Sequence, residues 1–339
     1  MKLAFKMTPQ RNTQYTNMVE TLAAPELLAS PLGSAIIELV PLILGGQGYL
    51  LATLKPDALL EQADLLEACA RLGATSEVYE YYERIGEVPG PLLRPLEPTW
   101  GPFVPLAMAE TRRYKGKTNE VFTQVLLNMA IFAGAYREQF CGHLRVLDPL
   151  AGGGTTLFVA LAAGYDAFGI EQVRQDVETT AVFSKQYFNS EHIPYKEVDE
   201  RHRRAGHRYQ FEVGRKGDTR LLVLAHGDTC QADLHMRELQ GGSHMHAIVA
   251  DLPYGIQHFG EIAPLLRRAL PVWSGLLLPG GTITLAWNAT HIDRQPLVEL
   301  IEQATPLHVR NEPPYTALAH TVDRVIKRRD VLVAVKPEG

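Results

Sequence analysis

The stretch VLDPLAGGGTT, residues 146–156, decides the fold. An apolar run ends at Asp148, three consecutive glycines follow, and the segment after them has the composition of a helix. This is the pattern of a buried strand, a tight turn and a helix. Glycines let the turn approach a ligand closely, and a helix N-terminus offers unpaired N–H groups. The stretch therefore predicts a ligand-binding strand–turn–helix unit.

Strands and helices alternate along the chain around this unit. Further strands are expected at 166–172, 220–228, 246–255 and 281–289, and helices at 119–133, 173–189, 261–277 and 296–304, with a hairpin-like pair at 315–328 and 330–337 closing the domain. Such alternation predicts an α/β fold with a doubly wound, mostly parallel sheet.

Acidic residues follow three successive strands of the predicted sheet. Asp148, Glu171 and Asp228 stand where the carboxyl ends of parallel strands meet and where such sheets bind ligands. An acid after the first strand repels a pyrophosphate but suits a ligand with an ammonium group and a sulfonium. The dinucleotide fingerprint G-x-G-x-x-G is absent, as is a phosphate-binding G-K-[ST]. Each acid alone would also suit a helix cap, but together with the glycine turn they predict an S-adenosylmethionine site.

Roles within this site follow from position. Glu171 is placed to bind both ribose hydroxyls, and Asp228 to accept from the adenine amino group. Thr118 precedes the helix at 119–133, where it suits either an N-cap or a hydroxyl near the cofactor carboxylate. The candidate cofactor residues are Thr118, Asp148, Pro149, Gly152, Gly154, Thr155, Glu171, Gln172, Asp228 and Thr229.

A second motif, ADLPYG at 250–255, ends the fourth strand. With this motif the chain resembles the amino-methyltransferases of nucleic acids, whose motifs are D-P-x-x-G-x-G-T followed by [DNS]-P-P-[YFW]. The resemblance spans roughly 115–337. It implies a class I Rossmann-like methyltransferase fold with a seven-stranded sheet and S-adenosyl-L-methionine as cofactor. The catalytic candidates are Asp251, Leu252, Pro253 and Tyr254.

These residue types suit the chemistry of an exocyclic amine, whose lone pair is delocalised into the base. A carboxylate of Asp251 and the carbonyl of Leu252 would each accept one N–H and draw the nitrogen toward sp³ geometry. Pro253 restricts Leu252 to extended backbone, which aims that carbonyl. Tyr254 would stack on a base extruded from its strand. The bland alternative is a strand-end acid beside a packed tyrosine.

Leucine stands at 252 where many members of the family have proline. The form D-L-P-Y-G is similar to that of the tRNA guanosine N2-methyltransferases. The resemblance therefore implies guanosine N2 in tRNA or rRNA as the target, and tRNA processing as the context. Those enzymes carry an N-terminal THUMP region, for which the N-terminal part here is short. The alternatives are a DNA adenine-N6 or cytosine-N4 methyltransferase and a non-catalytic, cofactor-binding RNA-binding protein.

Residues 1–86 predict a small α/β domain, a candidate for substrate recognition. Strands are expected at 35–42, 48–54 and 76–85, and helices near 17–30 and 56–73. Six prolines within 87–105 predict a stiff linker. The methyltransferase domain would then span 106–339.

The net charge of −5 is unlike that of a protein that grips long duplexes nonspecifically. Within 201–220, however, cations gather, and the stretch suits either a solvated loop or a phosphate contact. Its candidate nucleic-acid contacts are Arg201, Arg203, Arg204 and Arg208. RNA is the expected partner, and no membrane or metal partner is expected. Three distant cysteines and the lack of an apolar leader predict a cytoplasmic protein with reduced thiols.

Overall fold

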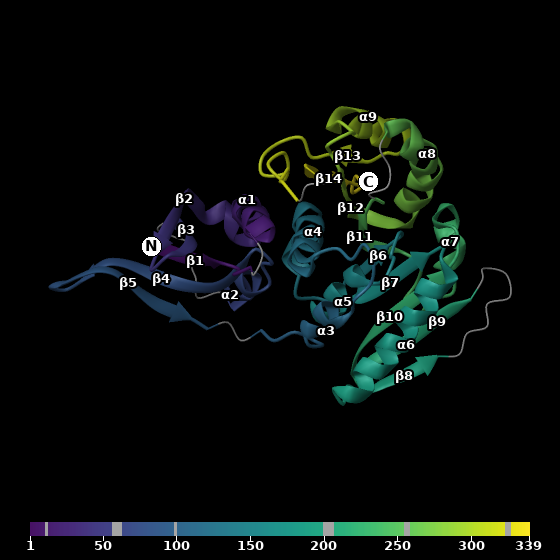
Figure 1. Ribbon diagram of the computed structural model, residues 1–339, viewed down its shortest axis with the longest axis horizontal. Helices are drawn as coiled ribbons and strands as arrows, with labels where there is room; N and C mark the ends of the chain where they lie inside the picture. The colour runs from purple at the N-terminus through teal and green to yellow at the C-terminus, as the bar shows by residue number, and fades with distance from the viewer. Residues whose placement is uncertain (11–12, 56–62, 98–99, 199–206, 254–257, 323–326) are drawn as a thin grey trace.

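The computed structural model describes residues 1–10, 13–55, 63–97, 100–198, 207–253, 258–322 and 327–339. These residues form two units, each built on a β-sheet of its own (Figure 1). Five strands make up the first sheet and nine the second, within the described ranges. The chain thus combines a small and a large α/β unit.

The N-terminal unit alternates strands and helices in the order β-α-β-β-α-β, followed by one more strand. Its elements are β1 (Lys2–Met7), α1 (Thr13–Ala29), the 3-10 turn η1 (Pro31–Ala35), β2 (Ile36–Leu44), β3 (Gln47–Leu54), α2 (Ala63–Ala70), β4 (Thr75–Ile85) and β5 (Val88–Leu96). The strands lie in the order β2-β3-β1-β4-β5, and all neighbours are antiparallel. The first four strands and two helices have the topology of ferredoxin-like folds. Strand β1, the centre of this sheet, was not predicted from the sequence.

The first half of the proline-rich segment at 87–105 forms a strand, β5. β5 contains Pro89, Pro91 and Pro95, and it pairs only with β4 in the described sheet. A proline cannot donate to a strand ladder, but an edge strand tolerates it because one side needs no partner. The expected linker is therefore wrong for residues 88–96, and the connection between the units begins after Leu96.

The larger unit carries the remaining elements. They are α3 (Ala107–Thr111), α4 (Glu120–Ala133), η2 (Arg137–Gln139), β6 (Arg145–Asp148), α5 (Thr155–Ala162), β7 (Asp166–Glu171), α6 (Arg174–Ser190), β8 (Tyr195–Val198), β9 (Arg208–Arg215), β10 (Asp218–His226), η3 (Thr229–Gln231), α7 (Ala232–His235), β11 (Met245–Asp251), α8 (Phe259–Leu276), β12 (Leu277–Asn288), α9 (Arg294–Ala304), β13 (His308–Val309) and β14 (Arg329–Val335). The expected doubly wound, Rossmann-like α/β fold is confirmed.

The strands of the large sheet lie in the order β13-β14-β12-β11-β6-β7-β10-β9-β8. From β12 to β10 the five central strands are parallel. The chain proceeds outward from β6 through β7 to β10, then returns to β11 on the other side of β6. Ligands of such sheets bind outside the carboxyl ends at this reversal, so the fold places a binding crevice beside β6 and β11.

Two details of the large sheet differ from expectation. Nine strands are present in the described part rather than seven, because β9 and β8 extend the sheet beyond β10 by antiparallel pairing. At the other edge, the expected strand at 315–328 is reduced to one isolated bridge between His320 and Arg329, while 323–326 lie outside the described residues. Apolar periodicity alone did not distinguish a strand from a packed loop there.

Helices cover both faces of the large sheet and bury two apolar cores. One core includes Phe122 of α4, Phe158 of α5 and Phe188 of α6, and it continues into the N-terminal unit. The other includes Trp273 of α8 and Trp287 of β12. Described helices thus cover both faces of the sheet, which leaves the ends of its strands open to a ligand.

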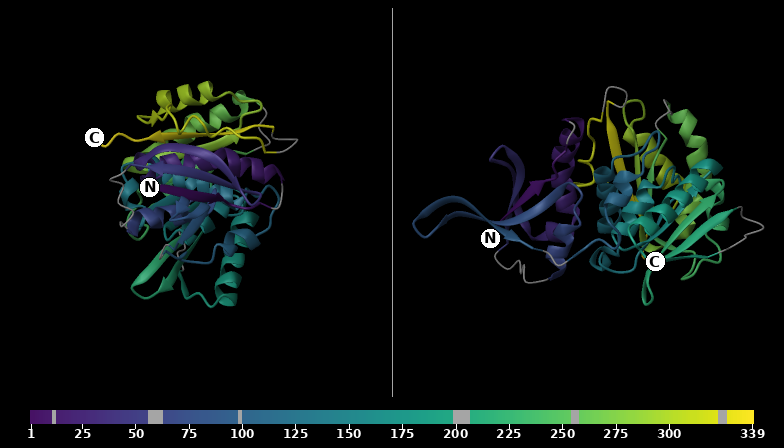
Figure 2. Two further views of the ribbon diagram at one scale, coloured as in Figure 1. Left: turned by 90° about the vertical axis from the view of Figure 1, so that its left-hand side faces the viewer. Right: turned by 60° about the horizontal axis from the view of Figure 1, so that its bottom comes forward.

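The N-terminal unit packs on the large unit through its helices, with α1 beside α4 and the small sheet on the far side (Figure 2). The fully buried Glu26 of α1 joins them. Its carboxylate accepts from the amides of Gly73 and Ala74 and from the side chain of Asn128 on α4, at 2.7–2.9 Å. Burial raises the pKa of Glu26 despite these donors. The contact fixes α4, whose N-terminus reaches the carboxyl ends of the sheet.

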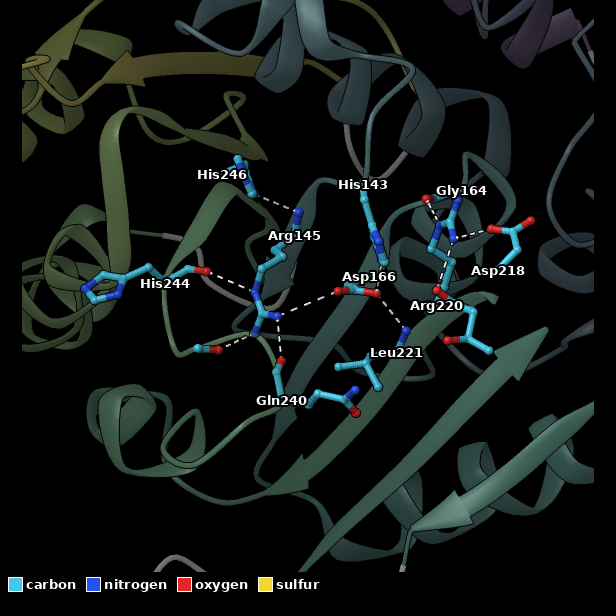
Figure 3. A network of polar contacts seen from close by, with 12 residues as sticks. His143, Arg145, Gly164, Asp166, Asp218, Arg220, Leu221, Gln240, His244 and His246 are labelled. Carbon is cyan, nitrogen blue, oxygen red and sulfur yellow. Dashed lines mark hydrogen bonds and ion pairs between the residues drawn. The ribbon is translucent and has the colours of Figure 1, made fainter. Parts of the chain in front are cut away.

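A network of polar contacts closes the amino ends of the large sheet (Figure 3). Arg145 of β6 donates to the carbonyls of Gln240 and His244 and lies 3.7 Å from the carboxylate of Asp166. Asp166 also accepts from the amide of Leu221 at 2.7 Å and lies 2.8 Å from Nε2 of His143. At the amino ends of the strands, each of these buried charges therefore has an opposite charge or several polar groups beside it.

Within the described residues no helix is both long and apolar enough to cross a membrane. The same residues contain no cluster of three or more side chains that could ligate a metal ion. The thiols of Cys69, Cys141 and Cys230 are free of disulfides.

Candidate functional site

One cavity lies at the carboxyl ends of β6, β7, β10 and β11, with a volume of about 540 Å³. That is within the usual range for sites that take a cofactor-sized ligand. Twelve of the residues singled out from the sequence line it: Thr118, Asp148, Pro149, Gly152, Thr155, Glu171, Gln172, Asp228, Thr229, Asp251, Leu252 and Pro253. Parallel pairing explains why residues so far apart in sequence meet here.

The glycine turn after β6 forms the floor of this cavity. Gly152 and Gly154 have φ of +49° and +88°, which an L side chain rarely adopts. Gly154 lies behind the cavity as the residue before α5, so its part is to shape the turn. A Cβ on Gly153 would come within 2.4 Å of the ring of Tyr114. Gly153, the middle glycine of the three, thus makes room for an aromatic side chain over the turn.

Asp148 ends β6 with its side chain buried in the cavity wall. It accepts from the amide of Leu150 at 2.9 Å. Burial raises the pKa of Asp148 to about 7, and the nearby carboxylates of Asp251 and Glu171 add to that rise. Near neutral pH the group is thus divided between its two forms, and a cation in the cavity would favour the carboxylate.

Glu171 joins two turns at the end of β7. One carboxylate oxygen accepts from the amide of Gly152 and the other from the amide of Val173, at 2.9 and 2.8 Å. Each carboxylate oxygen can accept a second hydrogen bond, so a ligand with two adjacent hydroxyls suits this side chain. Glu171 therefore both shapes the glycine turn and presents acceptors to the cavity.

Asp228 and Thr229 follow β10 on the far side of the cavity. The amide of Cys230 donates to Asp228 at 2.9 Å and lowers the pKa of this carboxyl, which also lies 3.4 Å from Arg268. The Thr229 hydroxyl accepts from the indole of the buried Trp273 at 3.0 Å. Asp228 is thus an ionised acceptor at the cavity wall, while Thr229 holds α8 in place.

The motif at the end of β11 lies beside Asp148. The amide of Leu252 donates to the carbonyl of Ala286 on β12 at 2.8 Å, which fixes the peptide between Asp251 and Leu252. Asp251 accepts from the hydroxyl of Thr118 at 2.8 Å through its Oδ2. Tyr254 lies outside the described residues.

Thr118 does not cap α4. The cap is Asn119, whose side chain accepts from the amide of Phe122 at 3.0 Å. The expectation of a Thr118 N-cap is therefore wrong by one residue, and the Thr118 hydroxyl is directed to Asp251 instead.

The expected nucleic-acid contacts have a different outcome. Arg201, Arg203 and Arg204 lie outside the described residues. Arg208 is buried, and its guanidinium donates to the carbonyls of His235 and Arg237 at 3.0 Å. It is thus not an exposed cation, and that assignment is corrected, because β9 turns this side chain inward against α7.

The segment before α4 covers the glycine turn, and from it the sequence predicted Thr118 as a site residue but not Tyr114, Lys115 or Gly116, which also line the cavity. The Tyr114 hydroxyl lies 2.7 Å from the hydroxyl of Thr155, and its ring packs over Gly153. Lys115 lines the cavity, and Arg113, two residues earlier in the chain, is exposed. The signal was present in RRYKGK at 112–117, which carries four cations in six residues just before a helix.

Similarity to known proteins is found among solved structures. No protein-family model matches this chain, and no curated protein matches it. Among solved structures, TrmN from Thermus thermophilus is similar over 99% of both chains, at 14% identity and a TM-score of 0.45. The T. thermophilus 16S rRNA N2 G1207 methyltransferase RsmC, solved with AdoMet and guanosine, is 14% identical over 89% of this chain and 59% of its own, with a TM-score of 0.36. The Methanococcus jannaschii fibrillarin pre-rRNA processing protein covers 63% of this chain and 75% of its own, with 14% identity and a TM-score of 0.38.

Proposed function

We propose that this protein is an S-adenosylmethionine-dependent methyltransferase that acts on an exocyclic amino group of an RNA base, with guanosine N2 as the first target. The observation that carries the proposal is the set of like charges around the cavity. Burial raises the pKa of Asp148 to about 7, and the like charges of Asp251 and Glu171 add to that rise. Such a set favours a ligand that brings positive charge.

The residues present fit S-adenosylmethionine. Asp148 would hold the ammonium group, Glu171 the ribose hydroxyls and Asp228 the adenine amino group. Lys115 at the rim would face the carboxylate of the methionine part. When bound, this cofactor supplies an electrophilic methyl group on a sulfonium. A pyrophosphate-containing cofactor fits poorly, because four acids surround the space that it would need.

The motif at the end of β11 supports attack by an amine. Asp251 and the carbonyl of Leu252 lie at consecutive positions, and the Leu252 amide is fixed to β12. Two acceptors so placed can each take one N–H of an exocyclic amine and turn its lone pair away from the ring. Proximity and orientation then supply much of the rate, since no covalent intermediate with the protein is needed.

Charge at the cavity mouth supports a nucleic-acid substrate. Lys115 lines the cavity and is exposed, Arg113 two residues earlier in the chain is exposed as well, and neither forms an ion pair with another of the described residues. The other two cations of the segment are engaged, Arg112 with Thr179 and Lys117 with Glu120. Two uncompensated cations on the segment that borders an acidic cavity suit a nucleic acid whose phosphates stay outside the cavity while the amine of one base enters it.

The experiment is methyl transfer from labelled S-adenosylmethionine to unmodified tRNA, rRNA and duplex DNA, with nucleoside analysis by mass spectrometry. The proposal expects N2-methylguanosine in RNA and none with an Asp251→Ala variant. N6-methyladenosine or N4-methylcytidine would contradict the assigned base, and methylation of DNA alone would contradict the assigned polymer. Cofactor binding without turnover on any nucleic acid would favour a non-catalytic protein.

A further inference from the structure

We propose that Thr118 is a positioning residue for Asp251, a role that rests on the proposed function and adds a residue to its catalytic motif. The Thr118 hydroxyl lies 2.8 Å from Oδ2 of Asp251, and the two residues are 133 positions apart in sequence. Both line the same cavity. The contact therefore joins the segment before α4 directly to the end of β11.

Thr118 is held firmly on both sides. Asn119 caps α4 through the amide of Phe122, and the ammonium group of Lys117 donates to the carbonyl of Glu110 at 3.0 Å and contacts Glu120. Helix α4 itself is buried along most of its length and packs against β11 and β12. A hydroxyl on such a support has little freedom to move with the carboxylate that it binds.

A fixed donor on one carboxylate oxygen does two things for Asp251. It stops the carboxylate from rotating about its Cβ–Cγ bond, so the orientation presented to a substrate amine is constant. It also stabilises the ionised form of the carboxylate, because a donor favours the charged acceptor. An acceptor for an amine N–H must be ionised and aligned, and Thr118 supports both.

This role differs from direct binding of the cofactor. A threonine hydroxyl has a single proton to donate, and here Asp251 takes it. Lys115, three residues earlier on the same segment, lines the cavity and is suited to a carboxylate. Loss of the Thr118 hydroxyl should therefore affect turnover more than cofactor affinity.

The test compares Thr118→Val, Thr118→Ser and Thr123→Val. Thr123 lies on the first turn of α4, and its hydroxyl donates to the carbonyl of Asn119 at 3.0 Å, so its variant controls for a loosened helix start. We expect kcat to fall by about tenfold or more in Thr118→Val, since a hydrogen bond to a charged group is lost. The dissociation constant for S-adenosylmethionine should stay within about twofold, while Thr118→Ser and Thr123→Val keep kcat near the wild-type value.

An unchanged kcat in Thr118→Val would overturn the proposal, as would a Thr118→Ser variant as slow as the valine one. A large rise in the cofactor dissociation constant, with kcat kept at saturation, would make Thr118 a cofactor ligand instead. If the wild type itself methylates no nucleic acid, the proposed function fails separately.

A readout independent of turnover remains in that case. The carboxyl of Asp251 can be followed by carbon NMR in protein labelled at aspartate, with its signal assigned through Asp251→Asn. Its titration midpoint should move to higher pH in Thr118→Val and stay in place in Thr118→Ser. A midpoint that is the same in all three proteins would overturn the positioning role.

Discussion

Buried charge lies both at the amino ends and at the carboxyl ends of the strands of the large sheet, but it is balanced in opposite ways at the two. At the amino ends, Arg145 and Asp166 oppose each other, and backbone groups satisfy much of what remains (Figure 3). At the carboxyl ends, Asp148, Glu171 and Asp251 carry the same sign around an open cavity. A balanced network stabilises a fold, whereas an unbalanced one costs stability until a ligand of the other sign binds. This difference in charge balance distinguishes the structural network at the amino ends from the candidate binding site at the carboxyl ends.

The largest effect is expected from Asp251→Ala. Turnover on RNA should fall by about 100-fold or more, in the range of positioned acid–base groups, because the amine loses its charged acceptor. Cofactor affinity measured by calorimetry should change little. The surface variant Asp233→Ala, which removes an acid paired only with Arg237 in the described contacts, is the control. Equal losses in affinity and turnover would show that Asp251 belongs to the cofactor site.

At the amino ends of the strands, Arg145→Met should lower the stability of the fold without changing cofactor binding. Its partner Asp166 is buried, and breaking a buried ion pair costs about 3 kcal/mol or more. We expect a lower free energy of unfolding in a urea titration, with an unchanged cofactor dissociation constant for the folded protein. An Arg145→Met variant that binds cofactor poorly while remaining as stable as the wild type would contradict the division between a structural network at the amino ends and a binding site at the carboxyl ends.

Glu171→Ala should weaken cofactor binding by about 1.5–3 kcal/mol, the loss of a charged hydrogen bond. Stability should also decrease, because the carboxylate holds the amides of Gly152 and Val173. Glu178→Ala, which removes a partly exposed acid paired with Arg174 on α6, serves as control for loss of charge. A dissociation constant equal to that of the wild type would contradict the ribose role.

Much of this site was predictable because its residues follow strands. Apolar runs ending in Asp148, Glu171 and Asp251 mark strand ends, and parallel pairing then brings these ends together. The cap at Asn119 and the direction of the Thr118 hydroxyl were not predictable, since both depend on how α4 meets β11. Tyr114 was missed for the same reason: its contact with Gly153 joins segments with no local pattern in common.

The fold errors also have physical causes. Proline excludes a central strand but permits an edge strand, and composition does not distinguish that edge from a linker, so β5 was missed. Arg208 belongs to a cationic stretch, yet strand β9 turns it inward, because alternate residues of a strand face opposite sides. Charge counted along a sequence does not give the face on which it lies.

The most direct test of the central claim is calorimetric titration of S-adenosylmethionine at about pH 6 and about pH 8, on either side of the raised pKa of Asp148. The carboxylate form binds a cation, and protonation removes it as the pH falls through about 7. The account predicts one bound cofactor per chain, with an affinity about tenfold higher at the upper pH, and a loss of this dependence in Asp148→Asn. Absence of binding at both pH values, or an affinity that is the same at both, would contradict it.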